Sequence, residues 1–192
     1  MAYKKYVLSA LAVIAGIAVL FLLVRYGGSA LVPNLTGNIQ VESDSLAQET
    51  GALKDARAPY FDLPNVRGDH VQLSQFIDTP LVIVFWSTWN SVAADQIKIL
   101  DDYVRNQSVA QQFVKVVAIN SQEERTIVTS FMKRGGYEVQ TLIDARGDVS
   151  EKYDIKSVPT FFFLDRGGVI REEFAGVLSE KAIAQKTEQL LK

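Results

Sequence analysis

Few side chains in this 192-residue sequence are capable of covalent or metal chemistry. The chain has no cysteine and a single histidine, His70. Zinc, haem-thiolate and iron–sulfur sites draw on cysteine and clustered histidine, so the composition argues against all three. Disulfide exchange needs a thiolate as its nucleophile, so this polypeptide alone cannot perform it.

The remaining reactive candidates have simpler structural interpretations. Ser91 follows an apolar run and would lie at a helix N-terminus, but a serine nucleophile needs an adjacent base, and His70 is far along the chain. A capping role for Asn90 or Ser91 is the better prediction. Asp144, Asp148 and Asp154 could be imagined as a carboxylate cluster for a hard metal, although turn and capping roles explain them more simply. We therefore expect no metal and no cofactor.

The elements around these residues alternate between strand and helix patterns. The apolar run at 81–86 is typical of a central strand covered on both faces, and Gly68-Asp69 marks a hairpin that carries a solvent-facing His70. Further strands are predicted at 114–119, 139–143, 160–164 and 169–174, and helices after residue 90 and at 123–133, 148–153 and 179–191. The order predicts an α/β fold with a central mixed sheet flanked by helices.

Local signals add detail to the predicted helices. Ile127 and Phe131 are expected to face the core from the helix at 123–133, and Gly135-Gly136 to end it. Asp148 is expected to cap the short helix that follows, and Ser179 the last one.

The N-terminal segment has the composition of a membrane anchor. Residues 7–24 are uncharged and apolar apart from Ser9, and about 18 helical residues span about 27 Å, close to the thickness of a bilayer core. Lys4 and Lys5 precede the run and Arg25 alone follows it, which places residues 1–6 in the cytoplasm. A cleaved signal peptide ending near Gly28-Ser29-Ala30 is the alternative, but the apolar run is long for one.

The domain organisation follows from the same pattern. Residues 25–57 are predicted to be a linker, and residues 58–192 a single globular domain on the periplasmic or extracytoplasmic side of the membrane. The expected location is the cytoplasmic membrane, crossed once. The formal net charge of −2 gives no electrostatic reason to expect nucleic acid binding.

Four landmarks give the sequence from about Ala58 to the C-terminus a family resemblance. They are the entry segment 58–64, Phe85-Trp86-Ser87-Thr88-Trp89, Val158-Pro159-Thr160 and the turn at 165–168. In this order and spacing they resemble the membrane-anchored TlpA/ResA-like thiol–disulfide oxidoreductases and their redoxin relatives. The resemblance implies a thioredoxin-like fold and a cis-proline at Pro159.

The same resemblance shows what is missing. The family's Cys-x-x-Cys motif falls on Asn90, Ser91, Val92 and Ala93, so Asn90 and Ala93 occupy the cysteine positions. The acidic residue that often follows on the helix falls at Gln96. The buried aspartate of thioredoxin falls at Val84. No catalytic residue is therefore predicted.

The substrate groove of the family could persist without its cysteines. The resemblance places Val158 and Pro159 on one wall and Trp89, Asn90 and Ser91 on the other, around an extended peptide. Alternatively, these residues survive only as packing and loop geometry.

The sequence leaves three alternative functions. The first is a non-catalytic module that binds or assembles an unknown envelope protein or peptide. The second is the family's oxidoreductase role, dependent on a cysteine-bearing partner. The third is a domain that stabilises a membrane complex through its outer helices.

Overall fold

The computed structural model describes residues 53–110 and 114–191, with side chains for 53–106 and 114–191. The predicted anchor at 7–24 and nearly all of the predicted linker lie outside these residues. Within the described part, no helix combines the length and the apolar character needed to cross a membrane.

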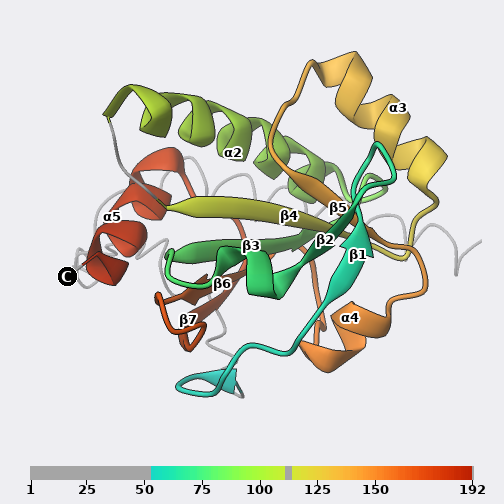
Figure 1. Ribbon diagram of the computed structural model, residues 1–192. Helices are drawn as coiled ribbons and strands as arrows, with labels where there is room; N and C mark the ends of the chain where they lie inside the picture. Colours follow the sequence, from blue (N-terminus) through green and yellow to red (C-terminus); the bar gives the residue numbers. More distant parts are fainter. Residues whose placement is uncertain (1–52, 111–113, 192) are drawn as a thin grey trace, which may run out of the picture. The chain divides into compact units, whose positions relative to one another are not determined.

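A five-stranded mixed sheet forms the centre of the described domain (Figure 1). Its order is β5-β4-β3-β6-β7; β3 pairs in parallel with β4, as β4 does with β5, and β6 is antiparallel to both β3 and β7. The strands are β3 (Leu81–Trp86), β4 (Lys115–Ser121), β5 (Thr141–Asp144), β6 (Thr160–Leu164) and β7 (Ile170–Ala175). The predicted thioredoxin-like α/β fold is confirmed.

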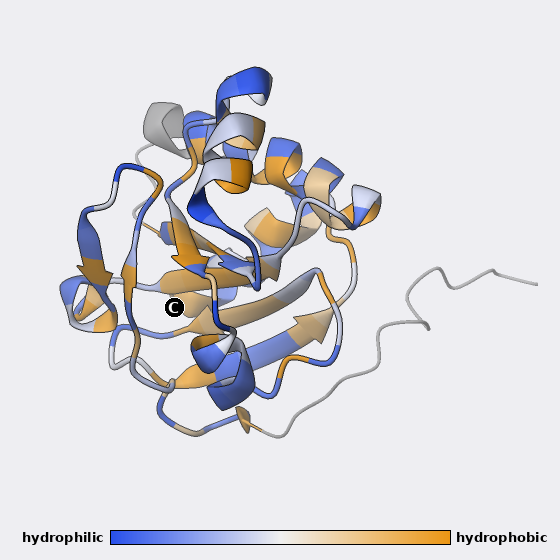
Figure 2. Ribbon diagram, turned by 90° about the vertical axis from the view of Figure 1, so that its right-hand side faces the viewer, coloured by the Kyte–Doolittle hydropathy of each residue, from blue (hydrophilic) through white to orange (hydrophobic). Residues whose placement is uncertain are grey.

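Helices α2 (Ser91–Ala110), α3 (Arg125–Gly135) and α5 (Glu180–Leu190) pack on one face of the sheet. The other face is covered by the hairpin of β1 (Asp62–Pro64) and β2 (His70–Gln72), the 3-10 helix η2 (Leu73–Phe76) and α4 (Asp148–Lys152). Successive side chains of β3 point to opposite faces, so the strand contributes to both cores and is buried throughout. In Figure 2 the central strands are largely hydrophobic, whereas the helices also carry hydrophilic faces.

The orientation predicted for α3 is wrong by one position. Val128 and Met132 are its buried residues, whereas Ile127 is 51% exposed and Phe131 is only partly buried against the ring of Trp86. Both pairs have i, i+4 spacing and lie next to each other around the helix, so periodicity alone does not distinguish them. The helix ends as predicted, with Gly136 in the left-handed conformation.

The cap of α4 also differs from the prediction. Asp148 is the first helical residue, and Gly147 precedes it with a φ of 79° and no side chain to serve as a cap. Instead, the carboxylate of Asp144 at the end of β5 accepts hydrogen bonds from the N–H groups of Val149 (3.3 Å) and Ser150 (2.7 Å). Among the described residues no group of acidic or histidine side chains is arranged to hold a metal.

Residues 55–58 extend the sheet beside the start of β7. Arg57 pairs with Val169, and the N–H of Asp55 donates to the carbonyl of Ile170 over 2.8 Å. Pairing with the sheet therefore begins before Ala58, where the domain was expected to start.

Candidate functional site

Asn90 joins the N-terminus of α2 to the loop before β6. Its Oδ1 accepts a hydrogen bond from the N–H of Ala93 over 3.1 Å, which caps the helix. Its Nδ2 donates to the carbonyl of Val158 over 3.0 Å. The Val158–Pro159 bond is cis, as expected from the resemblance. One side chain thus connects the two segments that the sequence placed on facing walls.

The other residues predicted for the groove differ in exposure. Trp89 is 71% exposed, and Ser91 is the exposed first residue of α2. Val158 is partly buried and Pro159 is buried. The structure therefore presents Trp89, Ser91 and part of Val158 to solvent, while Pro159 serves the packing beneath them.

Two more apolar residues surround this position. Val92, in the first turn of α2, is 51% exposed, and Val177, in the loop between β7 and α5, is 47% exposed. The neighbours of Val177 fix that loop, because the Gly176 N–H donates to the Pro159 carbonyl over 2.9 Å and Leu178 bonds to Gln96. We call Trp89, Val92, Val158 and Val177 the Trp89 surface. Nothing local in the sequence indicates Val177.

Glu123 is a site residue that the sequence interpretation missed. Its carboxylate is buried and accepts hydrogen bonds from the Thr88 N–H (2.6 Å), the Thr88 hydroxyl (2.5 Å) and Asn120 Nδ2 (2.7 Å). Hydrogen bonds to a charged acceptor are the stronger kind, so Glu123 fixes the loop that carries Trp89. The sequence suggested only the start of a helix there, and α3 begins two residues later.

The positions of the family's acidic groups have acquired structural roles. Gln96 is buried, donates to the Leu178 carbonyl and accepts from the Leu178 N–H, each over 2.9 Å. Val84 is a fully buried core residue of β3. Neither an amide nor an alkyl side chain titrates near neutral pH, so neither position can transfer a proton to a reacting sulfur.

His70 makes its contact within the β1–β2 hairpin. It is exposed, as predicted, and its Nδ1 lies 2.7 Å from the Asp62 carboxylate. The hydrogen bond from His70, followed by that from Gln72, lowers the pKa of Asp62. The structure pairs His70 with Asp62 and provides no contact between His70 and Ser91 that would make a nucleophile–base pair.

Comparison with known proteins places this arrangement in a family. Residues 55–173 match the model of the AhpC/TSA family. The chain belongs to the AhpC/TSA family. Within it, the chain is 29% identical over 128 residues to the thiol-disulfide oxidoreductase ResA of Bacillus subtilis, covering 66% of this chain and 69% of the relative. It is 22% identical over 150 residues to ResA of Geobacillus kaustophilus, covering 78% and 85%.

Solved structures show the same fold. A thioredoxin-family thiol:disulfide interchange protein from Chlorobium tepidum superposes with a TM-score of 0.64 at 19% identity, covering 72% of this chain and 98% of that protein. StoA from Bacillus subtilis gives 0.60 at 18% identity, covering 68% and 97%. This AhpC/TSA-family chain is a TlpA/ResA-like thioredoxin-like protein, as the sequence landmarks indicated, and it contains no cysteine.

Proposed function

We propose that this chain binds an extended segment of an envelope protein on the Trp89 surface without exchanging disulfides. The observation that carries the proposal is the exposed apolar surface around Asn90 and Val158, at the very position where the family places its cysteines. Exposed apolar residues that lie together mark binding sites for other molecules more often than scattered ones do. The proposed role is that of a binding or assembly module.

The backbone beside the surface suits an extended partner. Val158 stands next to the exposed side chains, and its carbonyl uses one lone pair for Asn90, so the second remains for a peptide N–H. Pairing with exposed backbone is a general way to hold an extended chain, with pockets for alternate side chains providing specificity. Trp89, Val92 and Val177 carry no charge, which favours an apolar side chain in the partner.

The proposed location is the outer side of the cytoplasmic membrane. Residues 7–24 supply the span and residues 1–6 remain in the cytoplasm. Residues 25–54 act as a tether, and the exported domain begins at Asp55, where pairing with the sheet starts. This arrangement presents the Trp89 surface to proteins of the cell envelope.

Affinity capture from envelope extract tests the binding role. The full chain is compared with a Trp89→Ala/Val158→Asp double variant and with an Ile127→Ala control, which changes another exposed apolar residue, on α3. We expect the native chain and the control to retain a shared partner that the double variant loses, and the purified partner to bind the native chain directly. The same partners on all three proteins would refute the proposal.

The names of the relatives favour a second candidate, thiol–disulfide exchange that depends on a cysteine-bearing partner. In that case the isolated chain would stay inactive in insulin reduction and would raise the rate of the partner. Equal rates with and without the chain would exclude this role.

A further inference from the structure

A second apolar site lies at the opposite end of the central strands. Leu81 begins β3 and Leu164 ends β6, and both line a cavity of about 220 Å³. The Trp89 surface follows the end of β3 and precedes the start of β6, so the strands separate the two sites. We call this pocket the distal cavity; Arg57, Tyr60, Phe76, Ile77 and Asp165 are among its other lining residues.

The walls of the distal cavity are apolar and extend onto the surface. Phe76, Leu81 and Leu164 are buried at its base. Tyr60 and Ile77 are 52% and 61% exposed. Ligand pockets for drug-sized molecules usually measure about 300–1,000 Å³, so this smaller cavity suits a slender chain better than a fused ring system.

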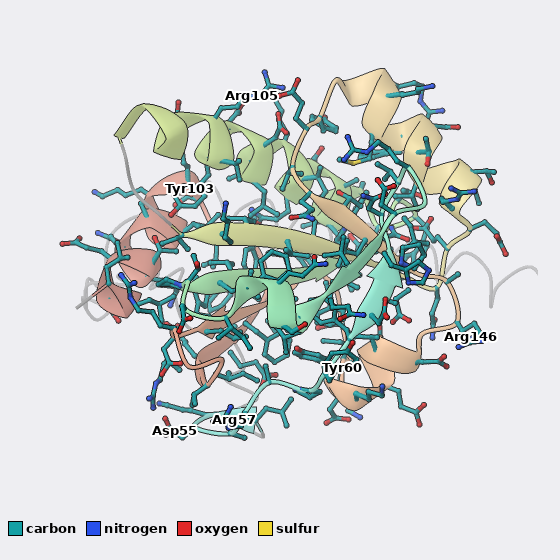
Figure 3. The ribbon with its side chains drawn as sticks, in the orientation of Figure 1. Asp55, Arg57, Tyr60, Tyr103, Arg105 and Arg146 are labelled. Carbon is teal, nitrogen blue, oxygen red and sulfur yellow. The ribbon has the colours of Figure 1, made fainter. Side chains whose placement is uncertain are left out.

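The lining of the distal cavity holds one cationic and one acidic side chain, Arg57 and Asp165. The guanidinium of Arg57 has no hydrogen-bond or ion-pair partner among residues 53–110 and 114–191. Asp165, the acidic residue of the lining, is already engaged by Arg171 and by the N–H groups of Gly167 and Val169. Arg57 and Tyr60 both belong to the segment that leads into β1 (Figure 3).

We propose that the distal cavity binds a medium-chain fatty acid, with the alkyl chain packed against Phe76 and Ile77 and the carboxylate at Arg57. An apolar slot beside an unpaired arginine fits both halves of such a molecule, because arginine offers a forked donor set to a carboxylate. Arg57 is exposed, so water hydrates its guanidinium until a carboxylate replaces that water. The proposal is independent of the function proposed for the Trp89 surface.

Photolabelling of the full chain in lipid nanodiscs with a diazirine-bearing octanoic acid tests this site. We expect labelling within 57–81 or 164–168, located by mass spectrometry, and competition by excess octanoate. Hexanoate should compete about 15-fold less well, because each buried methylene changes affinity roughly fourfold. Octanol should compete more weakly than octanoate, and equal competition would refute the role of Arg57.

Matched variants complete the test. Arg57→Gln and Ile77→Glu should each lower the labelling at least tenfold, whereas Arg134→Gln and Ile127→Glu, which change exposed residues of α3, should leave it intact. Labelling that octanoate does not reduce would indicate contact with the bilayer and refute the site. Labelling at the Trp89 surface, or equal labelling of all variants, would refute it as well.

Discussion

At the residue scale, Asn90 performs two tasks at the position of the family's first cysteine. Its oxygen caps α2 and its amide nitrogen donates to the carbonyl of Val158, so one side chain satisfies both segments. Glu123 fixes the adjacent loop through Thr88. Asn90 and Glu123 thus hold in place the backbone segments that carry the Trp89 surface.

Substitution of Asn90 should separate its two hydrogen bonds. Asn90→Ala removes both, and we expect the free energy of unfolding to fall by about 1–3 kcal/mol in urea denaturation. Asn90→Asp keeps a capping oxygen but replaces the donor to Val158 with a second oxygen, which the Val158 carbonyl repels. Both variants should therefore show faster hydrogen exchange in residues 156–160. Ser91→Ala serves as the control and should change stability by less than about 0.5 kcal/mol. Unchanged exchange in Asn90→Asp would contradict the link to Val158.

At the scale of elements, the start of α2 keeps the geometry that the family uses for thiol chemistry. A helix N-terminus favours a thiolate through its unpaired N–H groups and its dipole. Ala93 is fully buried one turn into the helix, at the place of the second cysteine. The element is therefore intact although its reactive atoms are absent.

Placing cysteines at the two family positions should provide part of the family's thiol–disulfide exchange activity. We expect the Asn90→Cys/Ala93→Cys variant to form a disulfide between the new residues. With dithiothreitol as the reductant that returns this disulfide to the dithiol, the variant should reduce insulin above the no-protein rate, whereas the native chain and an Asn90→Ser/Ala93→Ser variant stay at that rate. Thiol titration before and after reduction measures the disulfide. A folded double-cysteine variant that forms no disulfide would show that α2 has moved away from the family geometry.

The turn between β6 and β7 depends on one carboxylate and on pH. Burial alone would raise the pKa of Asp165, but the N–H groups of Val169 and Gly167 and the side chain of Arg171 together lower it. A pKa that is lower in the folded state stabilises the fold above the unfolded value of about 3.9 and loses this effect as the pH falls through the folded value.

We therefore expect Asp165→Asn to lower stability by about 1 kcal/mol at pH 7, with the difference from the native chain shrinking below about pH 4. Urea denaturation across pH 3–7 measures it. Introducing Asp165→Asn into an Arg171→Gln protein should cost less stability than introducing it into the native chain. If the stability difference between the two proteins stayed constant from pH 3 to pH 7, the pH dependence would not come from the Asp165 carboxylate.

At the scale of the whole molecule, the absence of cysteine makes the predicted topology directly measurable. Single cysteines can be introduced at Gln185, which is exposed on α5, and at Ala2 in the predicted cytoplasmic segment. A membrane-impermeant maleimide should label Gln185→Cys on spheroplasts and Ala2→Cys only after permeabilisation. Labelling of both without permeabilisation, or of neither, would contradict the predicted orientation.

Several features of this protein followed from the sequence alone, because they depend on short stretches of chain. The central strands β3 and β6 begin and end at the residues predicted, since uninterrupted apolar runs of that length are stable only when both faces are covered. Ser179 caps α5 as predicted, through the N–H of Ala182. The exclusion of thiol chemistry needed composition only.

Other features were decided by the tertiary structure, because each joins segments distant in sequence. The choice of Val128 over Ile127 as the buried residue of α3 depends on where the helix lies against the sheet. Asp144 caps α4 because the chain between β5 and α4 brings its carboxylate to the helix N-terminus. Glu123 belongs to the site because its carboxylate accepts hydrogen bonds from Thr88, 35 positions earlier. The distal cavity likewise combines residues near 57–81 with residues near 164–168, and local periodicity carries no information about such non-local contacts.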